Sequence, residues 1–351
     1  MTPIPTAILS FGMSGRVFHA PFISQHRGFN FYGVWERSKD AAKELYPEVK
    51  VYRMLEEVLA DKEVELVIVN TPNYSHFEYA KKALEAGKHV VVEKPLVTTA
   101  AEGEELKAIA EASNVVLSVF QNRRYDSDLM TVKKVIEEGT LGKIVEAEIH
   151  YDRSNQALSP KIHKENAGPG TGALYDLGSH LIDQALYLFG MPQAVFADVR
   201  TMRPGSLIDD YFEVLLYYPD LRVRLHTSYF VHAPLPSYII HGTSGSFTKS
   251  RADVQEADLQ AGRKPGGAEW GIEPAGEEGT LFTQKDGKAS TIKVDTLAGN
   301  YMQYFDGIYK AIRNNEPAPV TALDGINVIR IIEAAYQSSR EQKVINIPSN
   351  G

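Results

Sequence analysis

The sequence predicts an α/β protein made of two domains. Short apolar runs alternate with helical segments as far as about residue 124, which is typical of a doubly wound parallel sheet. A glycine-rich turn follows the first of these runs. After residue 125 the strand-like runs follow one another across short turns, as in an antiparallel sheet. We therefore expect domains at 1–124 and 125–351, the second being α+β with a large, mostly antiparallel sheet.

Composition limits the possible functions. The 351 residues are 43% hydrophobic and 23% charged, as in ordinary globular proteins. The net charge of -8 is spread along the chain without a basic block, so nucleic acid and membrane surfaces are not expected partners. The absence of cysteine excludes disulfides and thiolate catalysis. The N-terminus has no signal-peptide pattern and no run is long enough to span a bilayer, so we expect a cytoplasmic protein.

In the first domain, continuous β-branched or apolar runs predict buried strands, and the longer amphipathic or polar segments between them predict helices. A glycine at position 87 is placed to end one of these helices. The predicted strands are 7–9, 29–35, 66–69, 90–92 and 115–120; the predicted helices are 15–25, 40–45, 54–60, 75–86 and 99–113.

In the second domain, a helix at 129–138 is followed by an alternating run at 144–151, a polar loop at 153–172 and an amphipathic helix at 173–189. Turn residues at 218–221 and 242–245 separate several of the strands that come next. We predict strands at 194–201, 210–218, 222–230, 237–241 and 246–249, a long loop at 252–279, and closing helices at 301–314 and 323–340.

The glycine-rich turn spans Ser10-Phe11-Gly12-Met13-Ser14-Gly15-Arg16. Such a turn between a strand and a helix brings backbone N–H groups close to a pyrophosphate at the positive end of the helix dipole. The usual fingerprint is Gly-x-Gly-x-x-Gly, and Ser10 occupies its first position here. Glycines before a helix also form plain turns, so this motif alone leaves both interpretations open.

Glu93-Lys94-Pro95 comes just after the predicted strand 90–92. In an open α/β sheet, ligands bind at the carboxyl ends of the strands. Lys94 is therefore placed to face a bound cofactor; the alternative is a solvated surface lysine.

Three motifs together give the chain a resemblance to a known protein family. Gly12-Met13-Ser14-Gly15-Arg16-Val17-Phe18-His19-Ala20-Pro21, Glu93-Lys94-Pro95 and Asp176-Leu177-Gly178-Ser179-His180 occur in that order. The chain resembles the glucose–fructose oxidoreductase, inositol dehydrogenase and MocA (Gfo/Idh/MocA) family, closest to the branch of NADP-dependent scyllo-inositol dehydrogenases. Two features depart from that branch: Ser10 replaces a glycine, and the loop at 161–166 lacks the expected tryptophan and arginine.

The resemblance implies an NAD(P)-binding Rossmann domain and a second domain that binds substrate and forms a homodimer or homotetramer through its sheet. It implies an enzyme that transfers a hydride between the nicotinamide and a secondary hydroxyl or ketone of a polyol, inositol or sugar. Two alternatives remain open: an enzyme that holds NAD tightly during a net non-redox sugar reaction, and a non-catalytic NADP(H) sensor.

Removing a hydroxyl proton during hydride transfer requires a base, and Lys94 and His180 are the candidates. Asp176 and His180 are four residues apart, so they share one face of a helix. Without a ligand, the same pair would be a helix-dipole carboxylate and a buried histidine. In the resembling family the matching positions are the catalytic lysine and the substrate-contacting Asp and His, so we predict Lys94, Asp176 and His180 as catalytic residues.

We expect the choice between NAD and NADP to depend on the residues at the end of strand 29–35. An acidic residue there favours NAD, whereas an arginine accommodates the 2′-phosphate of NADP, and Glu36-Arg37-Ser38 offers both. The resemblance favours NADP over NAD. Thr71, Pro72, Asn73 and His76 follow strand 66–69 and either contact the cofactor or form a helix entry. The complete set of expected cofactor contacts is Gly12, Met13, Ser14, Gly15, Arg16, Glu36, Arg37, Ser38, Thr71, Pro72, Asn73, His76, Glu93, Lys94, Pro95 and Asn122.

Polarity and family-like position suggest further substrate contacts, in addition to Asp176 and His180. These candidates are Arg124, Tyr125, Arg153, His163 and Tyr238. We expect no metal, because the ten histidines form no close ligand pair in the sequence and nicotinamide chemistry here needs no metal.

Overall fold

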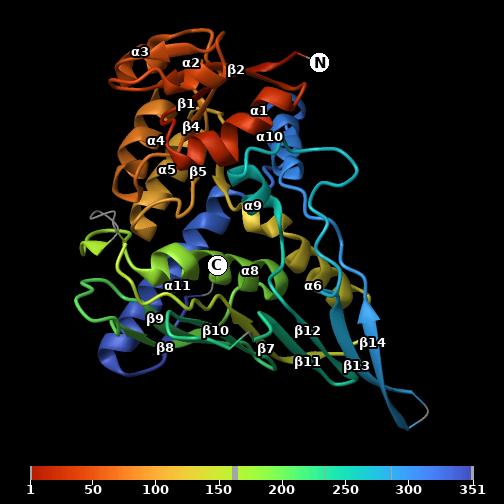
Figure 1. Cartoon of the computed structure of the whole chain (residues 1–351). Coiled ribbons are helices and arrows are strands. Elements are labelled where there is room, and N and C mark those ends of the chain that lie inside the picture. The colour runs from red at the N-terminus through yellow and green to blue at the C-terminus, as the bar shows by residue number, and fades with distance from the viewer. Residues whose placement is uncertain (1, 160–164, 234, 286, 349–351) are drawn as a thin grey trace. The chain divides into compact units, whose positions relative to one another are not determined.

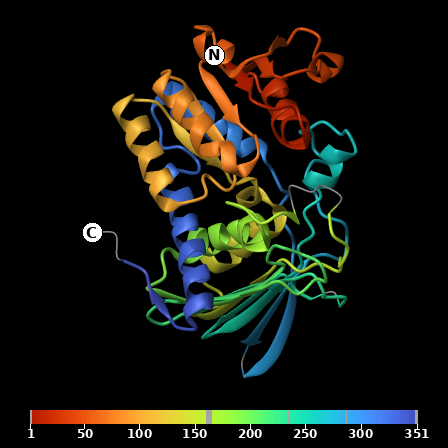
Figure 2. The same cartoon turned by 90° about the vertical axis from the view of Figure 1, so that its left-hand side faces the viewer.

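The computed structural model describes residues 2–159, 165–233, 235–285 and 287–348, and its elements are shown in Figures 1 and 2. They form two compact units. The first comprises the chain up to Asn122 together with Val254–Trp270 and Asn300–Ile326. The second comprises Arg123–Asp253, Gly271–Gly299 and the chain from Asn327 onward. The chain thus re-enters the first unit twice, whereas the sequence suggested one crossing near residue 124.

The sheet of the first unit has six strands in the order β3-β2-β1-β4-β5-β6, and every neighbouring pair is parallel. Its central strands are continuous apolar runs that are buried on both faces. The strands are β1 (Ile4–Ile8), β2 (Phe29–Trp35), β3 (Lys50–Tyr52), β4 (Leu66–Val69), β5 (His89–Glu93) and β6 (Leu117–Phe120).

The strand order reverses between β1 and β4, and right-handed crossovers therefore place α1 on one face and α4 and α5 on the other. In agreement, α4 packs along α5, and α1 packs along α10. The helices of this unit are α1 (Ala20–Gln25), α2 (Ala41–Leu45), α3 (Leu55–Ala60), α4 (His76–Glu85), α5 (Ala100–Ala112), α9 (Gln255–Gln260) and α10 (Met302–Asn314). The point of reversal lies at the carboxyl ends of β1 and β4, where this architecture binds its ligands.

The sheet of the second unit has nine strands in the order β14-β13-β12-β11-β7-β10-β9-β8-β15. All its pairs are antiparallel except β7 with β10. The strands are β7 (Ile144–His150), β8 (Ala194–Arg200), β9 (Tyr211–Tyr217), β10 (Arg222–Ser228), β11 (Tyr238–Gly242), β12 (Gly245–Lys249), β13 (Gly279–Lys285), β14 (Lys288–Val294) and β15 (Ile345–Asn346).

One face of this second sheet is apolar and packed. Ala147 and Ile149 on β7, and Val223 and Leu225 on β10, are fully buried, because alternate residues of each strand point to the same side. The helix α8 (Ser179–Phe189) lies over these two strands, and α6 (Ser127–Glu137) packs on β12. The long helix α11 (Ala322–Glu341) begins in the first unit and continues in the second.

The α/β prediction is confirmed, including the parallel first sheet and the mostly antiparallel second one. The short strand β3, the helix α9 inside the expected loop 252–279, and the strands β13, β14 and β15 were not predicted. β3 has only three residues, and β14 is largely exposed, so neither shows a clear apolar pattern. Among the described residues, no helix combines the length and apolarity that crossing a bilayer requires.

A buried ion pair joins the short turn before α6 to α8 in the second unit. Arg124 donates from Nε to Oδ2 of Asp183 over 2.8 Å and from Nη2 to Oδ1 over 2.7 Å. The two side chains are only 6% and 2% exposed. A bidentate pair of this kind stabilises a fold only while both charges are present.

We predict that Arg124→Met lowers the free energy of unfolding by about 3–5 kcal/mol, because it removes the guanidinium that compensates the buried Asp183. Urea denaturation measures this loss. The double variant Arg124→Met/Asp183→Leu should recover part of it, since it removes the buried charge as well. If the double variant loses as much free energy of unfolding as the two single variants together, the ion pair is not the source of the effect.

Candidate active site

The glycine-rich turn leaves β1 at the point where the first sheet reverses its order. A Cβ atom on Gly15 would lie 2.1 Å from the carbonyl oxygen of Ser10 and 2.9 Å from Nδ2 of Asn70, so only glycine fits there. Asn70, which follows β4, donates from this Nδ2 to the Ser10 oxygen over 2.8 Å. The turn is therefore held closed from the neighbouring strand end.

The turn continues into a π-helical turn, Gly15–His19, which places Ser14 and His19 on the carboxylate of Glu93 at the end of β5. The Ser14 hydroxyl donates to Glu93 Oε1, and His19 Nε2 lies 2.8 Å from the same oxygen. Burial alone would raise the pKa of Glu93, but His19 and Ser14 hold this pKa below its usual value. Glu93 is thus an ionised carboxylate that connects the glycine turn to the end of β5.

Lys94 comes directly after this carboxylate. Its backbone N–H donates to Glu93 Oε2 over 3.2 Å, and its peptide bond to Pro95 is cis. The residue is partly exposed, unlike Pro95, which is buried. The position of Lys94 in the fold therefore follows from the anchoring of Glu93.

His76, an expected cofactor contact, lies fully buried at the start of α4. Its Nδ1 is 2.8 Å from the carbonyl oxygen of Pro95, and its Nε2 is 2.8 Å from that of Thr71. Burial lowers the pKa of His76. In this structure the imidazole joins the loops that follow β4 and β5, which is a positioning role for the segment of Thr71, Pro72 and Asn73.

The carboxyl edge of the first sheet fits a dinucleotide. The side-chain oxygens of Asn70 and Gln121 are buried there and find no hydrogen-bond partner among the described residues. Asn122, next in the chain, is 6% exposed. Met13 and Arg16 are exposed on the glycine turn, and Arg16 donates its N–H to the Gly12 oxygen over 3.0 Å.

The segment after β2 separates its acidic and basic residues. Glu36 is 8% exposed, and its Oε2 accepts the backbone N–H of Ala42, near the start of α2, over 3.0 Å. Arg37 and Ser38 are exposed. Arg53 supports this segment, because its Nη1 donates to the carbonyl oxygens of Glu36 and Lys39 over 2.9 and 2.5 Å.

Asp176 and His180 belong to the second unit, whereas Lys94 belongs to the first. The expected helix there is not regular. A π-helical turn, Leu174–Gly178, contains Asp176, and α8 begins after it and contains His180. Asp176 is exposed and His180 is 6% exposed.

Asp209 holds the start of that π-helical turn. Its Oδ2 accepts the N–H of Leu174 over 2.8 Å, and its Oδ1 accepts the Tyr336 hydroxyl over 2.7 Å. A Cβ on Gly172 would lie 2.0 Å from the same Oδ1, at a φ of +99° that favours glycine. Burial raises the pKa of Asp209.

The remaining substrate candidates lie in different environments. Arg124 is bound to Asp183 and buried, and burial raises the pKa of Tyr125 to about 12. Arg153 is exposed, with its guanidinium 4.5 Å from the centre of the Tyr151 ring. His163 lies outside the described residues.

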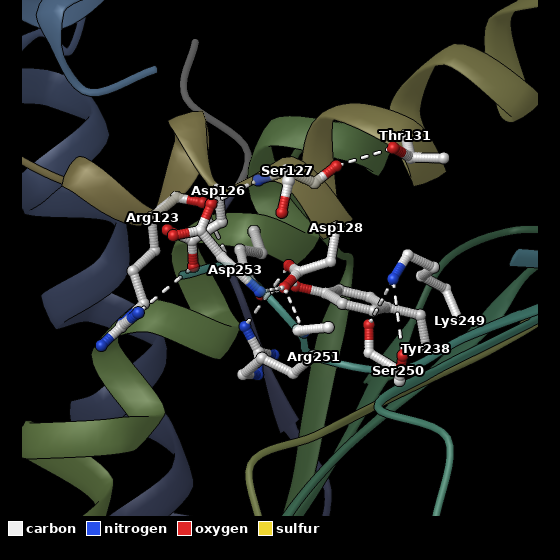
Figure 3. Close-up of polar contacts among 12 residues, drawn as sticks. Arg123, Asp126, Ser127, Asp128, Thr131, Tyr238, Lys249, Ser250, Arg251 and Asp253 are labelled. Atoms are coloured by element: carbon white, nitrogen blue, oxygen red, sulfur yellow. Dashed lines mark hydrogen bonds and ion pairs between the residues drawn. The ribbon is translucent and has the colours of Figure 1, made fainter. Parts of the chain in front are cut away.

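Tyr238 is buried within a polar network of the second unit (Figure 3). Its hydroxyl donates to Asp128 Oδ1 over 2.9 Å, and the Arg251 guanidinium lies 4.9 Å from the centre of its ring. Lys249 is also buried and binds Glu273 at 2.7 Å. Full burial and these internal partners favour a structural role for Tyr238 over substrate contact.

Sequence reasoning missed four polar residues around the carboxyl edge of the first sheet: His19, Arg53, Asn70 and Gln121. Two of them had a signal in the sequence, since His19 is part of the motif after the glycine turn and Asn70 directly follows a predicted strand. Arg53 had none, because it reaches its loop from β3, a strand that was not predicted.

Comparison with protein families matches both parts of the chain. Residues 4–121 match the NAD-binding Rossmann fold of an oxidoreductase family, and residues 133–347 match the C-terminal alpha/beta domain of the same family. The described geometry of the glycine turn and of the two sheets agrees with this pair of domains.

Individual relatives extend over nearly the whole chain. The NADP(+)-dependent scyllo-inositol 2-dehydrogenase IolW of Bacillus subtilis is 42% identical across 97% of this chain and 95% of its own. The YvaA oxidoreductase structure from Bacillus subtilis superposes with a TM-score of 0.95 at 41% identity, covering 99% of both chains. An oxidoreductase structure from Bacteroides fragilis has a TM-score of 0.90 at 45% identity, covering 98% of this chain and all of its own. The chain therefore belongs to the Gfo/Idh/MocA family of oxidoreductases.

Proposed function

We propose that this protein is an NAD(P)-dependent dehydrogenase that transfers a hydride between the nicotinamide and a secondary hydroxyl or ketone of a polyol, inositol or sugar. The observation that carries the proposal is the ionised carboxylate of Glu93. It binds Ser14 and His19 after the glycine turn, and Glu93 directly precedes Lys94. Two relatives with named substrates support the substrate class: the inositol dehydrogenase of Bacillus subtilis, and a levoglucosan dehydrogenase that is 39% identical over 155 residues.

The bound nicotinamide would supply the hydride chemistry. Lys94 is the proposed proton acceptor for the substrate hydroxyl, because it follows the strand end where the family binds its cofactor. His180 is proposed to bind the same hydroxyl or share the proton transfer, with Asp176 orienting substrate or imidazole. The homo-oligomer expected through the second sheet and the cytoplasmic location remain predictions.

NADP is the proposed cofactor. In many NAD-binding folds an acidic residue at the end of the second strand binds the ribose 2′-hydroxyl. Here the corresponding carboxylate of Glu36 accepts the backbone N–H of Ala42, while the side chain of Arg37 is exposed. This arrangement supports binding of the 2′-phosphate of NADP by the guanidinium of Arg37.

The first experiment follows the absorbance of reduced nicotinamide with a panel of inositols and sugars, using NADP and NAD separately. Turnover of a panel member with NADP as the better cofactor would support the proposal. Tight nucleotide binding without turnover of any panel member would contradict it and favour the retained-NAD enzyme or the sensor.

We predict that Lys94→Ala lowers kcat by about 100- to 10,000-fold, the usual contribution of a positioned acid or base. Nucleotide binding, measured by titration of protein fluorescence, should change little. The matched control is Lys82→Ala, an exposed lysine on α4. Near-normal turnover in Lys94→Ala would rule out the proposed role.

We predict that Arg37→Ala weakens NADP binding by about 10- to 100-fold, the equivalent of one lost charge-assisted hydrogen bond of about 1.5–3 kcal/mol. NAD binding should be nearly unchanged, because NAD lacks the 2′-phosphate. Isothermal titration with each nucleotide measures both values, and Arg27→Ala, exposed just before β2, is the control. Equal losses for NADP and NAD would remove the 2′-phosphate argument.

A further inference from the structure

Three potential metal ligands meet on the second sheet, on the face opposite α8. His150 ends β7, Asp152 follows two residues later, and His226 lies on β10. The parallel register of β7 and β10 pairs His226 directly with His150. Because paired residues point to the same side of a sheet, both imidazoles lie on one face, while Ile149 and Leu225 point to the buried one.

The carboxylate of Asp152 lies between the two rings. Its Oδ2 is 3.3 Å from Nδ1 of His150, and its Oδ1 is 2.9 Å from Nδ1 of His226. One donor atom from each residue can be chosen so that all three lie within 4.8 Å of one another. The ring centres are 5.3 Å apart and inclined by 51°, so the rings converge without stacking.

We propose that His150, Asp152 and His226 bind a divalent transition-metal ion of the zinc type. Two imidazole nitrogens and one carboxylate oxygen are a donor set that suits Zn²⁺ and do not suit Ca²⁺ or Mg²⁺. A tetrahedral ion with bonds of about 2.1 Å places neighbouring donor atoms about 3.4 Å apart. Each histidine lies at a similar distance from a different oxygen of Asp152, 3.3 Å from Oδ2 and 2.9 Å from Oδ1, so small side-chain rotations would bring one oxygen and both imidazoles onto a single ion. The fourth position is left for water or another ligand.

The surroundings of His150 support this site. Histidine ligands usually donate their second ring N–H to a carboxylate, which fixes the ring and its tautomer. The Nε2 of His150 lies 3.1 Å from Oε2 of Glu148, on the side of the ring away from Asp152. Arg224 in turn donates to Oε1 of Glu148 over 2.5 Å. Glu148, held by Arg224, is thus placed to accept the second N–H of a metal-bound His150.

The site is also negatively charged. In the single chain the side chains of Asp152, His150 and His226 are 12%, 14% and 20% exposed. Asp152 and Glu148 contribute two carboxylates; the guanidinium of Arg224 pairs with Glu148 and also with Glu213, and that of Arg251 donates to the His150 carbonyl oxygen over 3.3 Å. The absence of a close histidine pair and the chemistry of the nicotinamide gave no indication of this site, because its second histidine, His226, lies 74 residues from Asp152. The site is separate from the proposed dehydrogenase reaction and does not depend on it.

Zinc binding is tested on full-length protein without a histidine tag, stripped with a chelator and titrated with Zn²⁺ in a calorimeter. We expect one ion per chain in the unaltered protein. His226→Ala should weaken binding by more than about 100-fold, and Glu148→Gln by about 10- to 100-fold, since outer-shell partners have that effect. Co²⁺ in place of Zn²⁺ should show the visible absorption of a tetrahedral site, and His226→Ala should abolish it.

Two matched controls lie on the same face of the same sheet. His241 on β11 binds Ser246 Oγ at 2.8 Å, and its register partner is Glu146 on β7. His241→Ala and Glu146→Gln should leave zinc affinity unchanged. Asp152→Asn, which keeps the shape of the side chain, replaces His226→Ala if the latter fails to fold. Absence of zinc binding in the unaltered protein, or equal affinity in the ligand variants, would overturn the proposal.

Discussion

The ionised carboxylate of Glu93 is the contact on which the proposed nucleotide site depends. This side chain accepts hydrogen bonds from Ser14 and His19, which follow β1, and it belongs to the last residue of β5. Hydrogen bonds to a charged group contribute about 1.5–3 kcal/mol each, about twice the value for neutral pairs. The partners also satisfy a charge that burial would otherwise disfavour. The turn after β1 is in this way attached to the end of β5 by side chains of the protein itself.

The same principle recurs across the carboxyl edge of the first sheet. Asn70 closes the glycine turn from β4, and His76 joins the loops that follow β4 and β5. Each of these contacts uses a side chain that follows one strand to hold the backbone that follows another. A backbone held by its neighbours needs little reorganisation when it binds a nucleotide, and less reorganisation means a smaller entropic cost of binding.

The regular parts of the fold could be predicted from the sequence because they depend on local patterns. Buried parallel strands such as β4 and β5 are continuous apolar runs, and Gly15 marks the turn between β1 and its helix. Residues such as Arg53 could not be predicted, because their roles depend on which chain segments meet in space. The same limit applies to His226 on β10, whose neighbours are His150 at the end of β7 and Asp152 just after it.

The substrate candidates illustrate the same limit of sequence-based prediction. Arg124 and Tyr238 have the polarity of ligand-binding residues, but in the interior they contact Asp183 and Asp128, which no local pattern in the sequence indicates. Polarity alone does not distinguish a residue that binds a ligand from one that satisfies a buried charge. Distinguishing them requires the partner, and the partner is a property of the tertiary structure.

The two π-helical turns, Gly15–His19 and Leu174–Gly178, have a consequence for how these segments tolerate change in length. A π-helical turn contains one residue more than the α-helical turn it replaces, and such turns are frequent at functional sites. Deleting one residue from Leu174–Gly178 would therefore let the segment relax into a continuous α-helix rather than break it. The side chains before the deletion would largely keep their direction relative to α8, because the residue that is lost is the extra one of the π-helical turn. A deletion within α8 itself would instead rotate everything before it by roughly 100° about the helix axis, so the two neighbouring segments differ in the change of length that they tolerate.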